Sequence, residues 1–255
     1  MIAPVGAAQA DRLRALVAPY ARGSVTEASM RLPVERVRDA LGLPDIPHAH
    51  FLGGGCWLMG GSLLRWLCGQ LGPENNPGDF DLFFESRAAL ERTAVRLLRA
   101  GYVPKCFSLK GSPWDRRRKR IYNPVPDLSA LPEEEMLLYL HALATRPGLV
   151  AVDFRAPNGD LIQLSGVSSR ASAQEILALA DYTVCQMVMD GRDLHVGRYT
   201  WTDLMEGRLR ANQLGYPPIA MRRLVKYWKR GFRPDASTVG KVAGAVLGGR
   251  WRWPA

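Results

Sequence analysis

The chain has 255 residues, 47% of them apolar, which is enough to bury a core as one compact domain or two small ones. No apolar run approaches ~20 residues and the N-terminus lacks a basic start followed by an apolar stretch, so we expect neither a membrane span nor a signal peptide and predict a cytoplasmic protein. The net charge is +10, and the whole excess lies in the last 49 residues, where 11 basic residues accompany the single acid Asp235, so nucleic acid is the expected partner before membrane.

Two short helices are expected near the N-terminus, over residues 9–19 and 33–42. The link that follows carries His48 and His50, which we interpret as loop residues rather than metal ligands because no partner lies nearby in the sequence. The four cysteines are scattered through apolar segments without paired metal spacing. We therefore expect buried thiols, and neither zinc nor disulfides.

Residues 56–67 predict a strand, a tight turn and a helix. An apolar run meets Gly60, Gly61 and Ser62, and an amphipathic segment follows. Glycines let the backbone approach a ligand closely, and the first turn of a helix offers unpaired N–H groups. The turn is predicted to bind phosphate; the alternative is a plain turn.

The next predicted strand carries Asp79 and Asp81 on one face and Phe80 and Leu82 on the other, because side chains alternate along a strand. Two neighbouring carboxylates repel each other unless a cation lies between them, and hard oxygen ligands beside a phosphate site favour Mg²⁺ (or Mn²⁺). The alternative is a solvated strand end.

The middle of the chain predicts a helix over residues 87–100 that Ser86 caps and a strand over 102–109. Residues 111–147 break the pattern and are interpreted as an insertion with a helix of its own. Its basic run, residues 115–120, either grips a nucleic-acid backbone or is a solvated loop.

A hairpin is predicted from strands 149–155 and 161–167, since the Asn158-Gly159 pair supplies the positive φ angles of a tight turn. A short helix over 171–180 and a strand over 181–191 are expected next.

Residues 217–232 form a clear amphipathic helix pattern. The expected buried stripe consists of Met221, Leu224, Val225, Trp228 and Phe232. The opposite face carries Arg222, Arg223, Lys226, Lys229 and Arg230. A charged face is often only solvated, but the lack of acids on this one favours nucleic acid.

The glycine turn, the short helix and the Asp-x-Asp strand together resemble the signature of the DNA polymerase β-like nucleotidyltransferase superfamily. The segment that begins Asp181-Tyr-Thr-Val-Cys-Gln-Met resembles the Arg-Arg-Asp-Phe-Thr-Ile-Asn strand of CCA-adding tRNA nucleotidyltransferases and bacterial poly(A) polymerases. It looks closer still to a Phe-Asp-Phe-Thr-Val-Cys-Gln segment of small uncharacterised phage and bacterial proteins of this type.

The resemblance implies an α+β fold, with a nucleotidyltransferase-like mixed β-sheet and flanking helices, followed here by a basic helical C-terminal region. It implies that Asp79 and Asp81 hold the metal ion. The residues that it implies for NTP binding are Gly60, Gly61, Ser62, Arg65, Asp181 and Thr183, with Arg65 displaced by one position from the arginine of the family.

The sequence departs from the CCA-adding pattern at several positions. Leu179 and Ala180 replace the arginine pair, and no Glu-Asp-x-x-Arg occurs near Tyr216. Gln163 aligns with the third carboxylate of the superfamily. CCA addition itself is therefore not expected.

Three aspartates are candidates for the missing carboxylate. Asp153 lies mid-strand between apolar neighbours, where a carboxylate needs a partner, and we predict that it is the third metal ligand and a catalytic residue. Asp160 lies in a turn, where aspartate is common for local reasons. Asp181 is predicted by the resemblance to contact the sugar.

The predicted function is Mg²⁺-dependent transfer of a nucleoside monophosphate from an NTP such as ATP to a nucleic-acid acceptor, with RNA preferred and bound by the basic helix. One alternative is transfer to a protein or small-molecule hydroxyl. Another is a degenerate, non-catalytic nucleic-acid-binding domain. The predicted segments are N-terminal helices (1–49), a catalytic domain (50–199) and a basic helical region (200–255).

Overall fold

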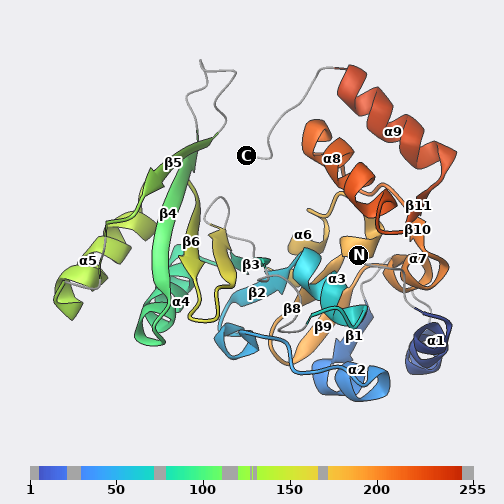
Figure 1. Ribbon diagram of the computed structural model, residues 1–255, viewed down its shortest axis with the longest axis horizontal. Helices are drawn as coiled ribbons and strands as arrows, with labels where there is room; N and C mark the ends of the chain where they lie inside the picture. Colours follow the sequence, from blue (N-terminus) through green and yellow to red (C-terminus); the bar gives the residue numbers. More distant parts are fainter. Residues whose placement is uncertain are drawn as a thin grey trace. The chain divides into compact units, whose positions relative to one another are not determined.

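The computed structural model describes residues 6–21, 30–71, 79–110, 120–126, 128, 131–165 and 172–248 (Figure 1). The chain forms two compact units. Unit 1 comprises Met1–Pro47, Met59–Gly72 and Ala173–Ala255, and unit 2 comprises His48–Leu58 and Pro73–Ser172. Both units are discontinuous in sequence, whereas the predicted segments 1–49, 50–199 and 200–255 are continuous; those segments stay a prediction.

Unit 2 is a mixed sheet with helices packed on it. Its elements are η1 (Ala49–Phe51), β2 (Cys56–Met59, whose last residue belongs to unit 1), β3 (Asp79–Phe84), α4 (Arg87–Arg99), β4 (Val103–Lys110), β5 (Arg120–Pro124), α5 (Glu133–Ala144), β6 (Leu149–Arg155) and β7 (Leu161–Ser165). The strand order is β2-β3-β7-β6-β4-β5. β3 and β7 are parallel, whereas the other pairs from β7 to β5 are antiparallel. Helix α4 packs on the sheet and α5 packs on α4 (Figure 1).

The alternation of side chains on β3 decides which face of this sheet is core. Phe80, Leu82 and Phe84 are buried, and the strand register aligns Phe80 with Ile162 and Ile162 with Phe154, both of which are also buried. These apolar side chains form the core of unit 2. The intervening residues of β3, β7 and β6 therefore lie on the opposite face.

Several local expectations in unit 2 are confirmed. Ser86 caps α4, since its hydroxyl accepts from the N–H of Ala89 at 3.1 Å. The β6–β7 hairpin forms, but only Gly159 of the Asn158-Gly159 pair has a positive φ, of 91°. Residues 111–119, with most of the basic run, lie outside the described part of the chain. The predicted insertion also contributes structure, because β5 pairs with β4.

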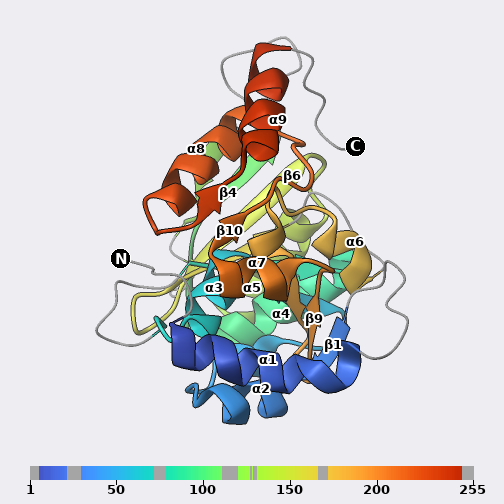
Figure 2. The ribbon, with the colours of Figure 1, turned by 90° about the vertical axis from the view of Figure 1, so that its right-hand side faces the viewer.

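Unit 1 carries an antiparallel sheet and most of the helices around it (Figure 2). Its elements are α1 (Ala7–Ala21), β1 (Met30–Pro33), α2 (Val34–Leu41), α3 (Gly61–Leu67), α6 (Ala173–Leu177), η3 (Thr183–Cys185), β8 (Met187–Met189), β9 (Asp193–Val196), α7 (Thr200–Glu206), β10 (Arg208–Leu209), α8 (Pro217–Trp228), β11 (Arg233–Pro234) and α9 (Ala236–Leu247). β9 pairs with both β1 and β8, and β10 pairs with β11. Helices α8 and α9 pack together (Figure 2). None of the helices described here is long and apolar enough to cross a bilayer.

Two predictions in unit 1 are wrong. The strand expected over 181–191 is instead the 3₁₀ helix η3 followed by the short strand β8, because the N–H groups of Cys185 and Gln186 donate back to Tyr182 and Thr183. An apolar run does not distinguish a buried turn of helix from a buried strand.

The buried stripe of α8 also differs from the predicted one. Its buried residues are Pro217, Ala220, Leu224 and Tyr227. Val225 is 39% exposed and Trp228 is 62% exposed. Both sets of residues follow the period of a helix. The buried ring of Tyr227 has a polar partner, because its hydroxyl lies 3.0 Å from Cys185 Sγ.

Candidate functional site

The two aspartates of β3 lie on the polar face of the unit 2 sheet. Asp79 is exposed and Asp81 is half-buried, whereas Phe80 between them is buried. The parallel register places Gln163 of β7 beside Asp81. The predicted pair of carboxylates is therefore on one face of one strand.

A polar row continues from Gln163 across the sheet. Gln163 Nε2 donates to Asp153 Oδ1 at 2.9 Å, and Cys106 Sγ donates to Asp153 Oδ2 at 3.2 Å. Burial, reinforced by Asp153, raises the pKa of the Cys106 thiol to about 11, so this thiol stays protonated and remains a donor. Both oxygens of Asp153 thus have partners within the row.

Asp153 lies two strands from Asp81, which corresponds to a separation of about 10 Å between the strand axes. Among the described residues, no group of three or more His, Cys, Asp or Glu side chains is placed to hold a metal ion. The role of Asp153 as a third metal ligand stays a prediction, and the row identifies Gln163 as the residue between it and Asp81. Two carboxylates still fit Mg²⁺, which usually keeps several waters and takes one or two carboxylates together with substrate phosphates.

The glycine turn between β2 and α3 has the backbone that its sequence predicts. Gly60 has φ 108° and ψ −153°, a region that only glycine adopts readily. A Cβ added to Gly61 would meet no other atom within 4 Å, so this side of the turn is open. Ser62, by contrast, is 2% exposed, and its hydroxyl finds no hydrogen-bond partner in the described structure. The accessible part of the turn is the glycine backbone.

Two pairs that involve arginine lie in unit 1, one of Arg223 with Asp181 and one of Arg230 with Arg65. Arg223 Nη1 lies 2.5 Å from Asp181 Oδ2, and burial raises the pKa of this carboxyl although Arg223 opposes the shift. Burial lowers the pKa of Arg230, and the nearby charge of Arg65 adds to this effect. Each pair thus joins one residue predicted for the nucleotide, Asp181 or Arg65, to one predicted for nucleic acid, Arg223 or Arg230.

Thr183, also predicted for the nucleotide, belongs to a buried network. Its hydroxyl donates to Asp203 Oδ2 at 2.5 Å, and Asp203 is fully buried. Arg210 donates to both oxygens of Asp203, at 3.1 and 3.2 Å, and this pairing raises the pKa of Arg210. No local motif connects these three residues, so this network could not be predicted from the sequence.

Helix α8 presents the remaining predicted nucleic-acid-binding residues. Arg222, Lys226 and Lys229 are exposed. They follow one another at spacings of four and three residues, so they form one basic ridge along the helix.

His48 has a larger role than the loop position that we expected. Its side chain is 8% exposed; Nδ1 lies 2.7 Å from the Tyr102 hydroxyl and Nε2 lies 2.7 Å from Asp160 Oδ2. Asn158 also donates to this Asp160 oxygen, at 2.9 Å. The ring packs edge-on against Phe80, so His48 lies on the apolar side of β3 and fastens the link to the β6–β7 turn.

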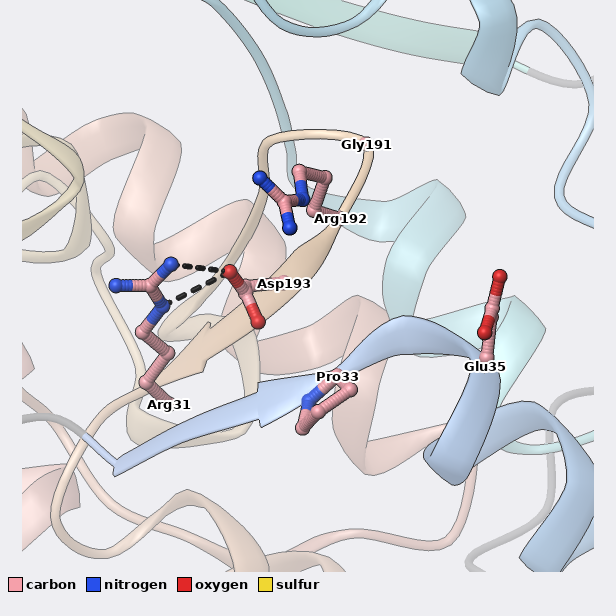
Figure 3. Close-up of a pocket in the computed structure, with 6 residues that line it drawn as sticks. All are labelled: Arg31, Pro33, Glu35, Gly191, Arg192 and Asp193. Carbon is pink, nitrogen blue, oxygen red and sulfur yellow. Dashed lines mark hydrogen bonds and ion pairs between the residues drawn. The ribbon is translucent and has the colours of Figure 1, made fainter.

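A hollow of about 550 Å³ in unit 1 contains none of the predicted site residues (Figure 3). Its lining consists of Arg31, Pro33, Glu35, Gly191, Arg192 and Asp193. Arg31 donates to Asp193 through Nε at 2.8 Å and Nη2 at 2.5 Å. The lining contains two arginines and two carboxylates, so it has no net charge that would select an anion.

Comparison with solved structures identifies the fold. The Thermotoga maritima CCA-adding enzyme complexed with tRNA aligns with a TM-score of 0.52 and 15% identity, over 86% of this chain and 46% of that one. A CCA-adding enzyme in complex with CTP aligns equally well, over 86% and 47%, and one with ATP has a TM-score of 0.50 and 16% identity. The chain has a nucleotidyltransferase-like fold.

This fold is α+β, as predicted, and the likeness shows the fold alone because the identity is so low. The chain spans about half the length of the enzymes that it matches. No family model matches it, and no curated protein has a significantly similar sequence.

Proposed function

We propose that this chain is a Mg²⁺-dependent nucleotidyltransferase that moves a nucleoside monophosphate from an NTP to a nucleic-acid acceptor, preferably RNA. The observation that carries the proposal is the pair Asp79 and Asp81 on the polar face of β3, within a nucleotidyltransferase-like fold. Two carboxylates one residue apart on one strand face are costly as neighbours unless they share a cation.

The roles follow from the chemistry of each group. Asp79 and Asp81 would hold the ion, which supplies stabilisation of the oxygens that gain charge at the α-phosphorus. The backbone of Gly60 and Gly61 would bind the triphosphate, with Arg65 adding positive charge. An acceptor hydroxyl oxygen would attack the α-phosphorus and lose its proton to solvent, while the bond between the α-phosphorus and the bridging oxygen breaks and pyrophosphate leaves with that oxygen.

The acceptor would bind to the basic ridge of α8. Arg222, Lys226 and Lys229 present positive charges at exposed positions on one side of the helix, where a phosphate backbone can contact them. Arg223 is held by Asp181 instead, and would act nearer to the nucleotide.

The direct experiment is incubation of the purified chain with each NTP, Mg²⁺ and a set of RNA acceptors, followed by mass spectrometry of both RNA and protein. We expect the RNA to gain one or more nucleotide masses, and Asp81→Asn to remove the gain. A mass gain on protein instead would indicate that the acceptor is a protein hydroxyl.

One observation favours a second candidate, a non-catalytic nucleic-acid-binding domain. Gln163 occupies the strand position beside Asp81 where a further carboxylate would complete a metal site, and an amide binds Mg²⁺ more weakly than a carboxylate. RNA binding without any mass gain, with every NTP and with Mn²⁺ as well as Mg²⁺, would support this candidate.

A further inference from the structure

We propose that Trp228 is a stacking platform for one unpaired base of the acceptor, so that the acceptor end is single-stranded where it meets α8. This inference rests on the RNA acceptor of the proposed function. It begins from the finding that Trp228 is 62% exposed, although it belongs to the apolar residues of an amphipathic helix.

The rotation of α8 is fixed by contacts on its buried side. The Tyr182 hydroxyl donates to the carbonyl oxygen of Ala220 at 2.7 Å, and the Tyr227 hydroxyl lies 3.0 Å from Cys185 Sγ. Leu224 is buried between these two positions. Because these contacts hold the helix, Trp228 is kept on the outer side and cannot turn inward without breaking them.

The surroundings of Trp228 are basic. Val225 lies one helical turn before it, and Val225 is three residues after Arg222 and four before Lys229, so one exposed side chain separates the indole from the basic ridge. The single acid of residues 207–255, Asp235, caps α9 by accepting from the N–H of Thr238 at 2.7 Å. An exposed ring separated by one side chain from a basic ridge, on a helix that carries no carboxylate, matches the two components of a nucleic-acid strand, base and phosphate.

A single strand with an unpaired base fits the exposed indole and the basic ridge better than a duplex does. Stacking on an aromatic ring needs a free base face, which the interior of a duplex does not offer, while the ridge cations contact phosphates of either form. A membrane surface fits less well, because interfacial helices insert a broad apolar face and the apolar face of α8 is already buried in unit 1.

The test measures binding of the full chain to a fluorescent oligoribonucleotide without NTP or added divalent metal. We expect Trp228→Ala to weaken binding of the single strand by about 5- to 100-fold, and Trp228→Phe to retain most of the affinity. The salt dependence should keep its slope in Trp228→Ala, because no phosphate contact is removed. Leu138→Ala, at a similarly exposed position (69%) on α5, is the matched control and should bind as the wild type does.

The second arm replaces the bases rather than the protein. The wild type should bind an abasic strand more weakly than the intact strand, by the same factor by which Trp228→Ala weakens binding of the intact strand. Trp228→Ala should bind the abasic and the intact strand with equal affinity. The proposal is overturned if Trp228→Ala binds the intact strand as the wild type does, or loses as much affinity for an abasic strand or a duplex. It is also overturned if the variant instead loses a dimer or binding to anionic phospholipid vesicles.

The experiments distinguish failure of the stacking proposal from failure of the proposed nucleotide transfer. Base-dependent binding through Trp228 with no nucleotide transfer in the mass assay would refute transfer alone. Transfer that is unaffected by Trp228→Ala, with unchanged strand affinity, would refute the stacking platform alone.

Discussion

Gln163 on β7 stands beside Asp81 on β3 as its register partner in the parallel pair. A glutamate at this position would bring a third carboxylate to the polar face of β3. We predict that Gln163→Glu lowers stability in metal-free buffer by about 1 kcal/mol, because like charges on neighbouring strands repel each other. This corresponds to a fall in melting temperature of about 2–4 °C.

Mg²⁺ should restore the melting temperature of Gln163→Glu and raise it more than it raises that of the wild type. Gln163→Ala, which loses the hydrogen bond to Asp153 without adding charge, is the control and should not respond in this way. Equal Mg²⁺ shifts in all three proteins would show that the side chain at position 163 does not contact a bound ion.

The second prediction concerns the two aspartates themselves. Asp79→Asn and Asp81→Asn should each lower nucleotidyl transfer by more than about 100-fold, as the loss of a group that stabilises developing charge does. Their melting temperatures in metal-free buffer should stay level or rise, since a repulsive pair is removed. Asp45→Asn, which removes an exposed carboxylate paired with Arg38, is the control for both measurements. Native turnover in Asp79→Asn would refute the metal-site assignment.

The third prediction separates Asp153 from Asp181 by steady-state kinetics. Asp153→Asn should lower kcat and leave the KM for NTP little changed if Asp153 acts on the metal site, whereas Asp181→Asn should chiefly raise that KM. The reverse pattern would exchange the two roles. A fully active Asp153→Asn would mean that Asp79 and Asp81 bind the ion with only water and substrate completing its shell.

The pH dependence of stability supplies a fourth prediction. Burial raises the pKa of Asp181, so this carboxyl contributes stability that is present below its ordinary value and is lost as the pH rises through the folded pKa. Asp235 has the opposite sign. Its pKa is lowered by hydrogen bonds from Thr238, so its contribution is present above the ordinary value and is lost as the pH falls through the folded pKa.

Denaturant unfolding from pH 3 to pH 7 measures both contributions. The free energy of unfolding of Asp181→Asn should rise relative to that of the wild type as the pH rises above about 4. Asp235→Asn should be less stable than the wild type near pH 7, and this difference should shrink as the pH falls. Parallel pH profiles for the wild type and Asp181→Asn would show that this carboxyl is not desolvated.

The fifth prediction addresses the basic ridge. Reversing Arg222, Lys226 and Lys229 to glutamate should weaken RNA binding and flatten its salt dependence by about 0.7 in the log–log slope for each lost single-strand contact. Reversal of the exposed Arg87, Arg92 and Arg99 on α4 changes the net charge equally and is the control. An unchanged slope in the α8 variant would make the ridge a solvated surface.

Features that depend on neighbours in sequence were predictable, and features that depend on distant partners were not. The Ser86 cap, the Asn158-Gly159 turn and the alternation of Asp79, Phe80 and Asp81 follow from the local chain. By contrast, nothing near Asp181 in the sequence indicates that Arg223, 42 residues later, pairs with it.

The errors have the same origin. Trp228 is exposed because the other side of α8 is the buried one. Tyr182 and Cys185, which lie outside the helix, hold that buried side through hydrogen bonds with Ala220 and Tyr227. His48 does lie in a turn, as expected, but its contacts were not predictable because Tyr102 and Asp160 are 54 and 112 residues away.

The discontinuity of unit 1 in the sequence affects the order in which the two units can fold during synthesis. Unit 2 is complete in sequence once Ser172 has been made, whereas unit 1 still lacks Ala173–Ala255, including β8, β9 and α8. Residues of its first helices that are buried in the complete unit, such as Leu13 and Val37, therefore lack part of their packing until the last third of the chain has been synthesised. We expect unit 2 to fold first and unit 1 to fold only after Ala173–Ala255 have been synthesised. Folding of unit 1 should be slow, because it depends on contacts between residues far apart in the sequence, and chaperones should be needed until it is complete.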